Sequence, residues 1–162
     1  MAEEEKKTHI EIHITRNGEE LTNWYAVTPT LLAAAEKEIF KVATQPTPEK
    51  LGAALERNGA VLDREDGPAR VYVQPAVYRE EEWYRDGKLH REGGPAHTVS
   101  DPNGFCLKVW YRNGERHRDD GPAYVSDGPI GHVEAWFKNG CPITPGAKLN
   151  LIPGVKVHPP KP

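Results

Sequence analysis

The chain has 162 residues, of which 37% are hydrophobic and 28% charged, and it carries a formal net charge of −3 at pH 7. A chain of this length forms one compact domain, or a small domain joined to a short repeat array. The slightly negative charge argues against bulk attraction to nucleic acid, so direct nucleic-acid binding is not expected. No apolar run approaches the ~20 residues of a membrane span. Two cysteines, Cys106 and Cys141, make no disulfide framework, which favours the reducing cytoplasm.

The N-terminal segment predicts a β-hairpin. Residues 1–7 are mostly charged, lack the apolar segment of a signal peptide and are predicted to be a disordered lead. Apolar residues then alternate with polar ones, which is the period of a half-buried strand: Ile10, Ile12 and Ile14. Asn17-Gly18 is a strong hairpin-turn signal, and residues 21–27 would form the return strand.

Two helices are predicted to follow the hairpin. Thr28-Pro29 pairs an N-cap residue with proline at the first helical position, and a helix over about 29–43 fits the apolar spacing. Thr47-Pro48 repeats this arrangement, and Asn58-Gly59 can end the second helix as a C-cap. We expect the region 8–59 to cap a repeat array, because terminal repeats are usually atypical.

The second half of the chain is built from a repeat. A block of about 14 residues occurs at 83–96 and again, almost unchanged, at 110–123. Gly-Pro-Ala begins at residues 67, 94 and 121, and tryptophan occurs at residues 83, 110 and 136. A fixed period of this size predicts stacked repeats. Each unit contains a strand ending in an aromatic pair, an Asp-Gly or Asn-Gly turn and a return strand, so residues 60–145 are predicted to be a meander of antiparallel hairpins. The predicted fold class is α+β, mainly antiparallel β.

Residues 82–91, which read Glu-Trp-Tyr-Arg-Asp-Gly-Lys-Leu-His-Arg, resemble the MORN family of hairpin repeats. The resemblance is to the variant with His-Arg-x-x-Gly-Pro-Ala, which is common in proteins of phages, large DNA viruses and bacteria. It implies a small inhibitor of a host bacterial protein, such as a defence nuclease complex, as an anti-CRISPR protein would be. The period is longer than in standard MORN units, and Arg91 and Arg118 replace their glycine, so a lipid-binding role is not carried over.

The aromatic pairs are the candidate binding residues. Neighbours in a strand face opposite sides of the sheet, so the pairs predict two aromatic rows, one on each face. Tryptophan has the larger area to bury, so the row predicted to face the core is Trp83, Trp110 and Trp136. The row predicted to be exposed and to bind a protein, together with Arg85 and Arg112, is Tyr84, Tyr111 and Phe137.

His90 and His117 recur in register and can be read as structural or as chemical. The structural interpretation is that each histidine and the arginine after it bond the backbone of the break at Gly94-Pro95 and Gly121-Pro122. The chemical alternative is a metal or acid–base site. Zinc needs three or four converging ligands, whereas residues one repeat apart are separated by intervening strands ~4.8 Å apart. We therefore expect no metal, no cofactor and no catalytic residue.

These observations favour a non-enzymatic protein–protein interaction module. The expected partner is a protein of a bacterial host. One alternative is a self-assembling scaffold or homodimer formed through open sheet edges. Another is an enzyme that uses the repeat histidines. Residues 146–162 are rich in proline and lysine, which predicts an extended, mildly basic tail.

Overall fold

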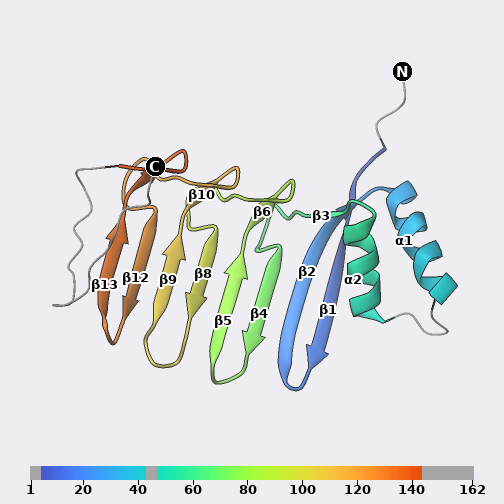
Figure 1. The fold of residues 1–162 in the computed structure, drawn as a ribbon, viewed down its shortest axis with the longest axis horizontal. Coiled ribbons are helices and arrows are strands. Elements are labelled where there is room, and N and C mark those ends of the chain that lie inside the picture. Colours follow the sequence, from blue (N-terminus) through green and yellow to red (C-terminus); the bar gives the residue numbers. More distant parts are fainter. Residues whose placement is uncertain (1–4, 43–46, 144–162) are drawn as a thin grey trace, which may run out of the picture.

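A long meander of hairpins forms the molecule, with two helices at its N-terminal end (Figure 1). A computed structural model describes residues 5–42 and 47–143. The predicted α+β class, mainly antiparallel, is confirmed. The predicted tail at 146–162 and the first four residues of the predicted lead lie outside the described residues.

The strands fall into one large sheet and three small ones. The large sheet has nine strands in the order β1-β2-β4-β5-β8-β9-β12-β13, with β3 beside β2. Its strands are β1 (Thr8–Arg16), β2 (Glu19–Val27), β3 (Val61–Leu62), β4 (Arg70–Gln74), β5 (Tyr78–Glu82), β8 (His97–Ser100), β9 (Cys106–Val109), β12 (Tyr124–Gly128) and β13 (Gly131–Ala135). The small sheets are the hairpins of β6 (Tyr84–Arg85) with β7 (Lys88–Leu89), β10 (Tyr111–Arg112) with β11 (Glu115–Arg116), and β14 (Phe137–Lys138) with β15 (Cys141–Pro142).

The N-terminal elements follow the predicted signals. Asn17 and Gly18 form the turn between β1 and β2, and both have positive φ, at 53° and 82°. Helix α1 spans Pro29–Val42 and α2 spans Pro48–Arg57. The side chain of Thr47 accepts a hydrogen bond from the N–H of Lys50 and caps α2, and Gly59 follows that helix with a φ of 95°.

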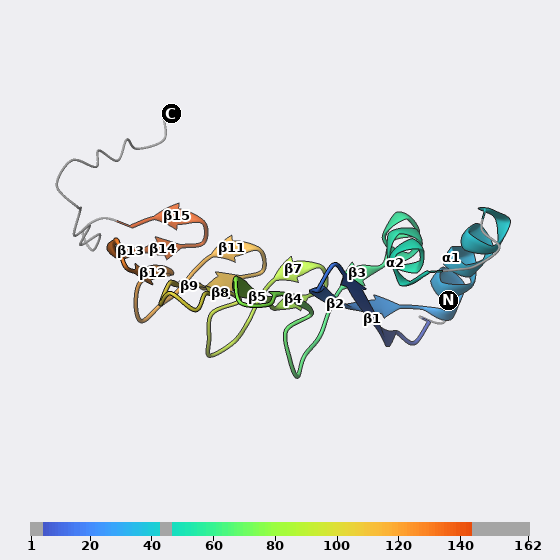
Figure 2. The same ribbon diagram turned by 90° about the horizontal axis from the view of Figure 1, so that it is seen from below.

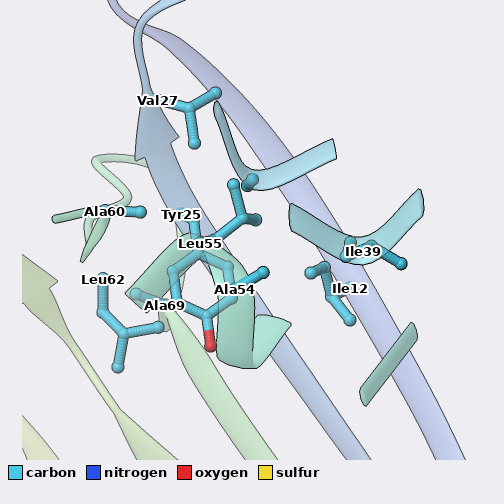
Figure 3. Packing of buried hydrophobic residues seen from close by; sticks show 10 residues of the cluster. Ile12, Tyr25, Val27, Ile39, Ala54, Leu55, Ala60, Leu62 and Ala69 are labelled. Atoms are coloured by element: carbon cyan, nitrogen blue, oxygen red, sulfur yellow. The ribbon is translucent and has the colours of Figure 1, made fainter. Parts of the chain in front are cut away.

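Within residues 5–42 and 47–143, the hydrophobic core cluster lies at this end. Ile12 and Tyr25 from the sheet pack with Ile39 of α1 and with Ala54 and Leu55 of α2 (Figure 3). Leu55 is fully buried and Tyr25 is 2% exposed. The helices cover one face of the first strands only, and the rest of the sheet extends away from them (Figures 1 and 2).

Each repeat leaves the large sheet at its tryptophan. β5 ends at Glu82 and β6 begins at Tyr84, so Trp83 belongs to neither strand. The expectation of one strand running through Trp83 and Tyr84 is therefore wrong. The N–H of Trp83 donates to the carbonyl of Ala96 at 2.7 Å, which turns the chain into the small hairpin. Viewed along the sheet, these hairpins form a second tier on the side of the helices (Figure 2).

The N-terminal hairpin contains a repeat unit that the sequence conceals. The N–H of Trp24 donates to the carbonyl of Ala69 at 2.7 Å, as that of Trp83 does to Ala96. Tyr25 pairs with Leu62 just as the aromatic residue after each later tryptophan pairs with its return strand. Residues 27–60, with both helices, thus take the place of a two-residue turn, and the sheet continues across the predicted division at residue 59.

Successive small hairpins are joined by main-chain hydrogen bonds. The turn glycine of each unit donates to a carbonyl in the return strand of the preceding unit, and the three bonds are Gly87 to Leu62 at 2.9 Å, Gly114 to Leu89 at 2.8 Å and Gly140 to Arg116 at 3.0 Å. A second bond crosses each junction in the other direction, from Arg64 to Tyr84, Arg91 to Tyr111 and Arg118 to Phe137. The register of each later unit is therefore set by its neighbours. We number the units by the tryptophan at the head of each: Trp24 for the first, Trp83 for the second, Trp110 for the third and Trp136 for the fourth.

Candidate functional site

Each junction carries an arginine stacked on a tryptophan. Cζ of the arginine lies within cation–π range of the ring centroid, and the three pairs are Arg64 on Trp24 at 4.2 Å, Arg91 on Trp83 at 3.7 Å and Arg118 on Trp110 at 4.1 Å. The planar guanidinium suits this contact better than an ammonium group would. The arginine at this position of each unit therefore has a structural role.

The same arginines hold the Gly-Pro-Ala segments. Nη1 of Arg91 donates to the carbonyl of Pro95 at 3.2 Å, and Nη1 of Arg118 donates to that of Pro122 at 3.3 Å, as expected for the arginines. The glycine of each segment lets the guanidinium approach. A Cβ at Gly121 would lie 2.9 Å from Cζ of Arg118, and the corresponding contacts at Gly94 and Gly67 are 3.1 and 2.7 Å. Any side chain at these glycines would disturb the stack.

His90 and His117 do something other than predicted. They cap the turn of the next unit instead of bonding the Gly-Pro backbone. The N–H of Asn113 donates to Nδ1 of His90 at 3.1 Å, and the N–H of Asn139 donates to Nδ1 of His117 at 3.2 Å. Asp63 has the same role in the first unit, where its carboxylate accepts from the next turn at 2.8 Å. The histidines thus orient the following hairpin.

Neither aromatic row is fully buried or fully exposed. All six side chains are half-buried: Trp83, Trp110 and Trp136 in one row, and Tyr84, Tyr111 and Phe137 in the other. The predicted core row is thus not a core. Tyr84 packs against the N-terminal core, and its hydroxyl donates to Glu82 at 3.2 Å. Among the other residues predicted to be structural, His117 and Gly121 are buried, whereas His90, Gly94, Pro95 and Pro122 are partly exposed.

Grooves open between successive units. One of them has a volume of about 720 Å³ and lies between the second and third units. It is lined by His90, Arg91, Glu92, Gly93, Gly94, Trp110, Tyr111, Arg112, Asn113, His117, Arg118, Asp119 and Asp120. A smaller groove of about 280 Å³ occupies the equivalent place one unit earlier, where Arg64, Glu65 and Asp66 face Trp83 and Arg91. The predicted binding residues Tyr111 and Arg112 lie in the large groove, and Arg85 lies in the small one.

Charges along the grooves are largely paired. Nη2 of Arg112 lies 2.9 Å from Asp119, and Nε of Arg118 donates to Asp120 at 2.9 Å. His117, whose Nε2 lies 3.1 Å from Asp119, and then Arg112 lower the pKa of Asp119 to about 2. The guanidinium of Arg118 likewise lowers the pKa of Asp120. Alternating, fixed charges suit the recognition of a complementary surface better than proton transfer.

Glu80, Glu82 and His97 form a cluster that sequence reasoning missed. One ligand atom from each lies within 4.8 Å of the others, which is close enough to hold a metal ion. Their present contacts are those of an ion-pair network. Nε2 of His97 lies 2.7 Å from Glu80, and Nη1 of Arg70 lies 3.1 Å from Glu82. The guanidinium of Arg70 beside Glu82 competes with a metal ion, and the ion pairs alone explain why these three side chains lie together.

Trp24 was also missed as the head of a unit, whereas the tail that contains Arg64 is marked by the Gly-Pro-Ala beginning at residue 67. Trp24-Tyr25 matches the head of the unit, and residues 63–69 match its tail. The helical insertion separates the two halves and breaks the period. Only the hydrogen bonds of Trp24 to Asp63 and Ala69 bring them into one unit.

Searches against protein-family models, curated proteins and solved structures find no match. The resemblance to the MORN repeat therefore rests on the sequence motif alone. Within residues 5–42 and 47–143, neither α1 nor α2 has the length and apolarity needed to cross a bilayer.

Proposed function

We propose that this protein is a non-enzymatic protein-binding module that uses the groove between its second and third units. The observation that supports this most is the groove itself, of about 720 Å³ and lined by half-buried Trp110 and Tyr111 beside Arg91, Arg112 and Arg118. Tryptophan, tyrosine and arginine are the residue types that dominate binding energy at protein interfaces. Arg118 is stacked on Trp110, Arg91 on Trp83, and Arg112 is paired with Asp119. These side chains therefore lose little freedom on binding.

The side chains of this groove are poorly suited to catalysis. The repeat histidines turn Nδ1 toward the next hairpin, and the two free cysteines, Cys106 and Cys141, do not line the groove. In the described part of the groove, Asp119 and Asp120 are each paired with an arginine. These pairs lower the pKa of both carboxyl groups, so the two carboxylates are weak proton acceptors and poor general bases.

The narrower expectation, an inhibitor of a bacterial host protein, follows from the resemblance of the repeat. Affinity capture from bacterial lysate tests both statements. The baits are the wild type, Tyr111→Ala in the groove, and Phe40→Ala as a control, because Phe40 is 67% exposed on α1. We expect one stoichiometric protein on the wild type and on Phe40→Ala, and its loss on Tyr111→Ala with the circular dichroism spectrum unchanged. Equal retention on all three baits would move the site away from this groove.

Self-assembly is the second candidate, and it rests on the edges of the large sheet. β1 and β13 each pair on one side only among the described strands. Open edges can accept a strand from a second copy. Sedimentation at high protein concentration tests this: a concentration-dependent dimer supports it, and a monomer throughout removes it.

A further inference from the structure

The second unit lacks a carboxylate that the first and third units contain. In those units the stacked arginine bonds an aspartate two residues further on. Nε of Arg64 donates to Asp66 at 2.7 Å, and Nε of Arg118 donates to Asp120 at 2.9 Å. The residue at this position in the second unit is Gly93. Among the described residues, no carboxylate oxygen lies within 4.0 Å of the Arg91 guanidinium.

Arg91 is nevertheless held in the same place as the other two arginines. It stacks on Trp83 more closely than they do on their tryptophans, and it donates to the carbonyl of Pro95. Glu92, the acid nearest in sequence, is directed to Arg85 at 3.3 Å. The Nε edge of Arg91 is therefore fixed in position and lacks the acceptor that its equivalents have.

The neighbouring histidine differs from its equivalent in the third unit only in its distance to a carboxylate. Nδ1 of His90 lies 2.9 Å from Oδ1 of Asn113 and accepts from the N–H of the same residue at 3.1 Å. Nε2 is buried without a hydrogen-bond partner in both His90 and His117. The nearest carboxylate oxygen lies 3.8 Å from Nε2 of His90, in Glu92, and 3.1 Å from that of His117, in Asp119. The missing acceptor of the second unit is therefore the one on Arg91.

We infer that the groove beside Arg91 receives the carboxylate of an aspartate or glutamate side chain from a protein partner. This inference rests on the proposed function and specifies the chemistry of the partner. The incoming carboxylate takes the place that Asp66 and Asp120 occupy in their own units. Hydrogen bonds between arginine and carboxylate are among the strongest that side chains form, and they fix orientation as well as charge. Stacking on Trp83 keeps the guanidinium ready for this contact.

The test uses a substitution that supplies the missing carboxylate from the chain itself, so that Arg91 no longer needs one from a partner. Gly93→Asp introduces an acid two residues after Arg91, as in the first and third units. Gly93→Asn is the matched control, because it has the same size without the charge. Both variants meet the same backbone demand, since Gly93 has a φ of 74°, and asparagine and aspartate tolerate that region better than most residues.

The probes are acetyl-Gly-Glu-Gly-amide and its uncharged partner, acetyl-Gly-Gln-Gly-amide. Each is titrated into ¹⁵N-labelled protein while the Nε–H signals of Arg64, Arg91 and Arg118 are followed by NMR. We expect the glutamate peptide to shift the Arg91 signal more than the other two, and the glutamine peptide to leave all three in place. The response should persist in Gly93→Asn and disappear in Gly93→Asp. Equal shifts at all three arginines, or an unchanged response in Gly93→Asp, would overturn the inference.

Capture from lysate separates this inference from the proposed function. A partner retained by the wild type and by Gly93→Asn but lost on Gly93→Asp supports both. A partner retained equally by Gly93→Asp overturns the carboxylate inference and leaves the binding function standing. No partner on any bait overturns the proposed function, and with it the assignment of a protein carboxylate.

Discussion

The first unit and the later units build the same junction with different stabilising forces. In the first unit, the chain between Tyr25 and Leu62 carries two helices, and these bury a hydrophobic core. In the later units a two-residue turn closes the hairpin, and the small hairpins are held by main-chain bonds, Trp–Arg stacks and turn caps. The shared junction is therefore specified by backbone pairing at the tryptophan, and it forms whether a two-residue turn or two helices follow it.

This contrast also explains why only the first unit contains an insertion. The turn glycines Gly87, Gly114 and Gly140 each donate to the preceding unit, so their turns cannot be replaced without losing that contact. In the first unit, the described residues between Tyr25 and Leu62 make no main-chain bond of this kind to another unit. We expect stability to be concentrated at the helical end and to decrease along the array, because each later unit depends on its neighbour.

The largest effect should come from the core. Leu55→Ala removes a fully buried side chain that packs against Tyr25. Such a change costs about 2–5 kcal/mol, and because every later unit is anchored on this end, the whole molecule should be destabilised. Urea unfolding followed by tryptophan fluorescence measures the loss. Phe40→Ala, at an exposed position of the neighbouring helix, is the control and should leave the midpoint in place.

A cap at the far end should have a smaller and more local effect. His117→Ala removes the acceptor for the N–H of Asn139, and the loss of such a partly buried hydrogen bond costs about 1 kcal/mol. Amide exchange should then accelerate in β14 and β15 and stay unchanged in β1 and β2. His117→Asp should restore part of the protection, because Asp63 caps the next turn in the first unit. Uniform acceleration over the whole sheet would contradict the local role.

Two turn glycines differ only in whether a neighbouring unit lies against them. Gly18 and Gly87 both have positive φ, so alanine at either position should cost about 1 kcal/mol from backbone strain. A Cβ at Gly87 would also lie 3.0 Å from Cβ of Val61, whereas nothing lies within 4 Å of one at Gly18. Thermal unfolding should therefore show the larger loss for Gly87→Ala. Equal losses would mean that the stacked hairpins move apart readily.

The smallest predicted effect is the contribution of Asp119 to the pH dependence of folding stability. The folded-state pKa of Asp119 is about 2, below its ordinary value, because His117 and Arg112 favour the carboxylate. A lowered pKa stabilises the fold above the ordinary aspartate value, and the stabilisation is lost as the pH falls toward the folded value. Asp119→Asn should thus lower the melting temperature slightly near neutral pH, and the difference from the wild type should shrink as the pH falls through about 2. The effect is small because half of the Asp119 side chain is exposed and water screens the pairs.

Local signals in the sequence specify the ends of elements and little about the tryptophan junctions. Asn17-Gly18 and Thr47-Pro48 identified the first hairpin and the second helix because the turn and the cap depend on adjacent residues. Which aromatic residue is buried could not be read in this way. Trp83 leaves the sheet because its N–H bonds Ala96, a residue far along the chain. Alternation along one strand therefore does not apply to Trp83 and Tyr84.

The candidate groove was predicted only in part for the same reason. Tyr111 and Arg112 were expected at a binding surface, and they line the groove together with residues from the preceding unit. The contribution of Arg91 depends on the aspartate that Gly93 replaces. The replacement can be read from the aligned repeats, but the bond from that aspartate to the stacked arginine is seen only in the structure. Repeats are most informative where one copy departs from the others.

The bonds at each junction also define an order in which the units can fold during synthesis. Every hairpin pairs with the one that precedes it in the chain, and the only large hydrophobic core in the described residues is completed by residue 69. A chain emerging from the ribosome can therefore bury its core first and then add one unit after another, each onto a finished template. Such sequential growth leaves few unpaired strand edges exposed at any moment, which limits aggregation during synthesis.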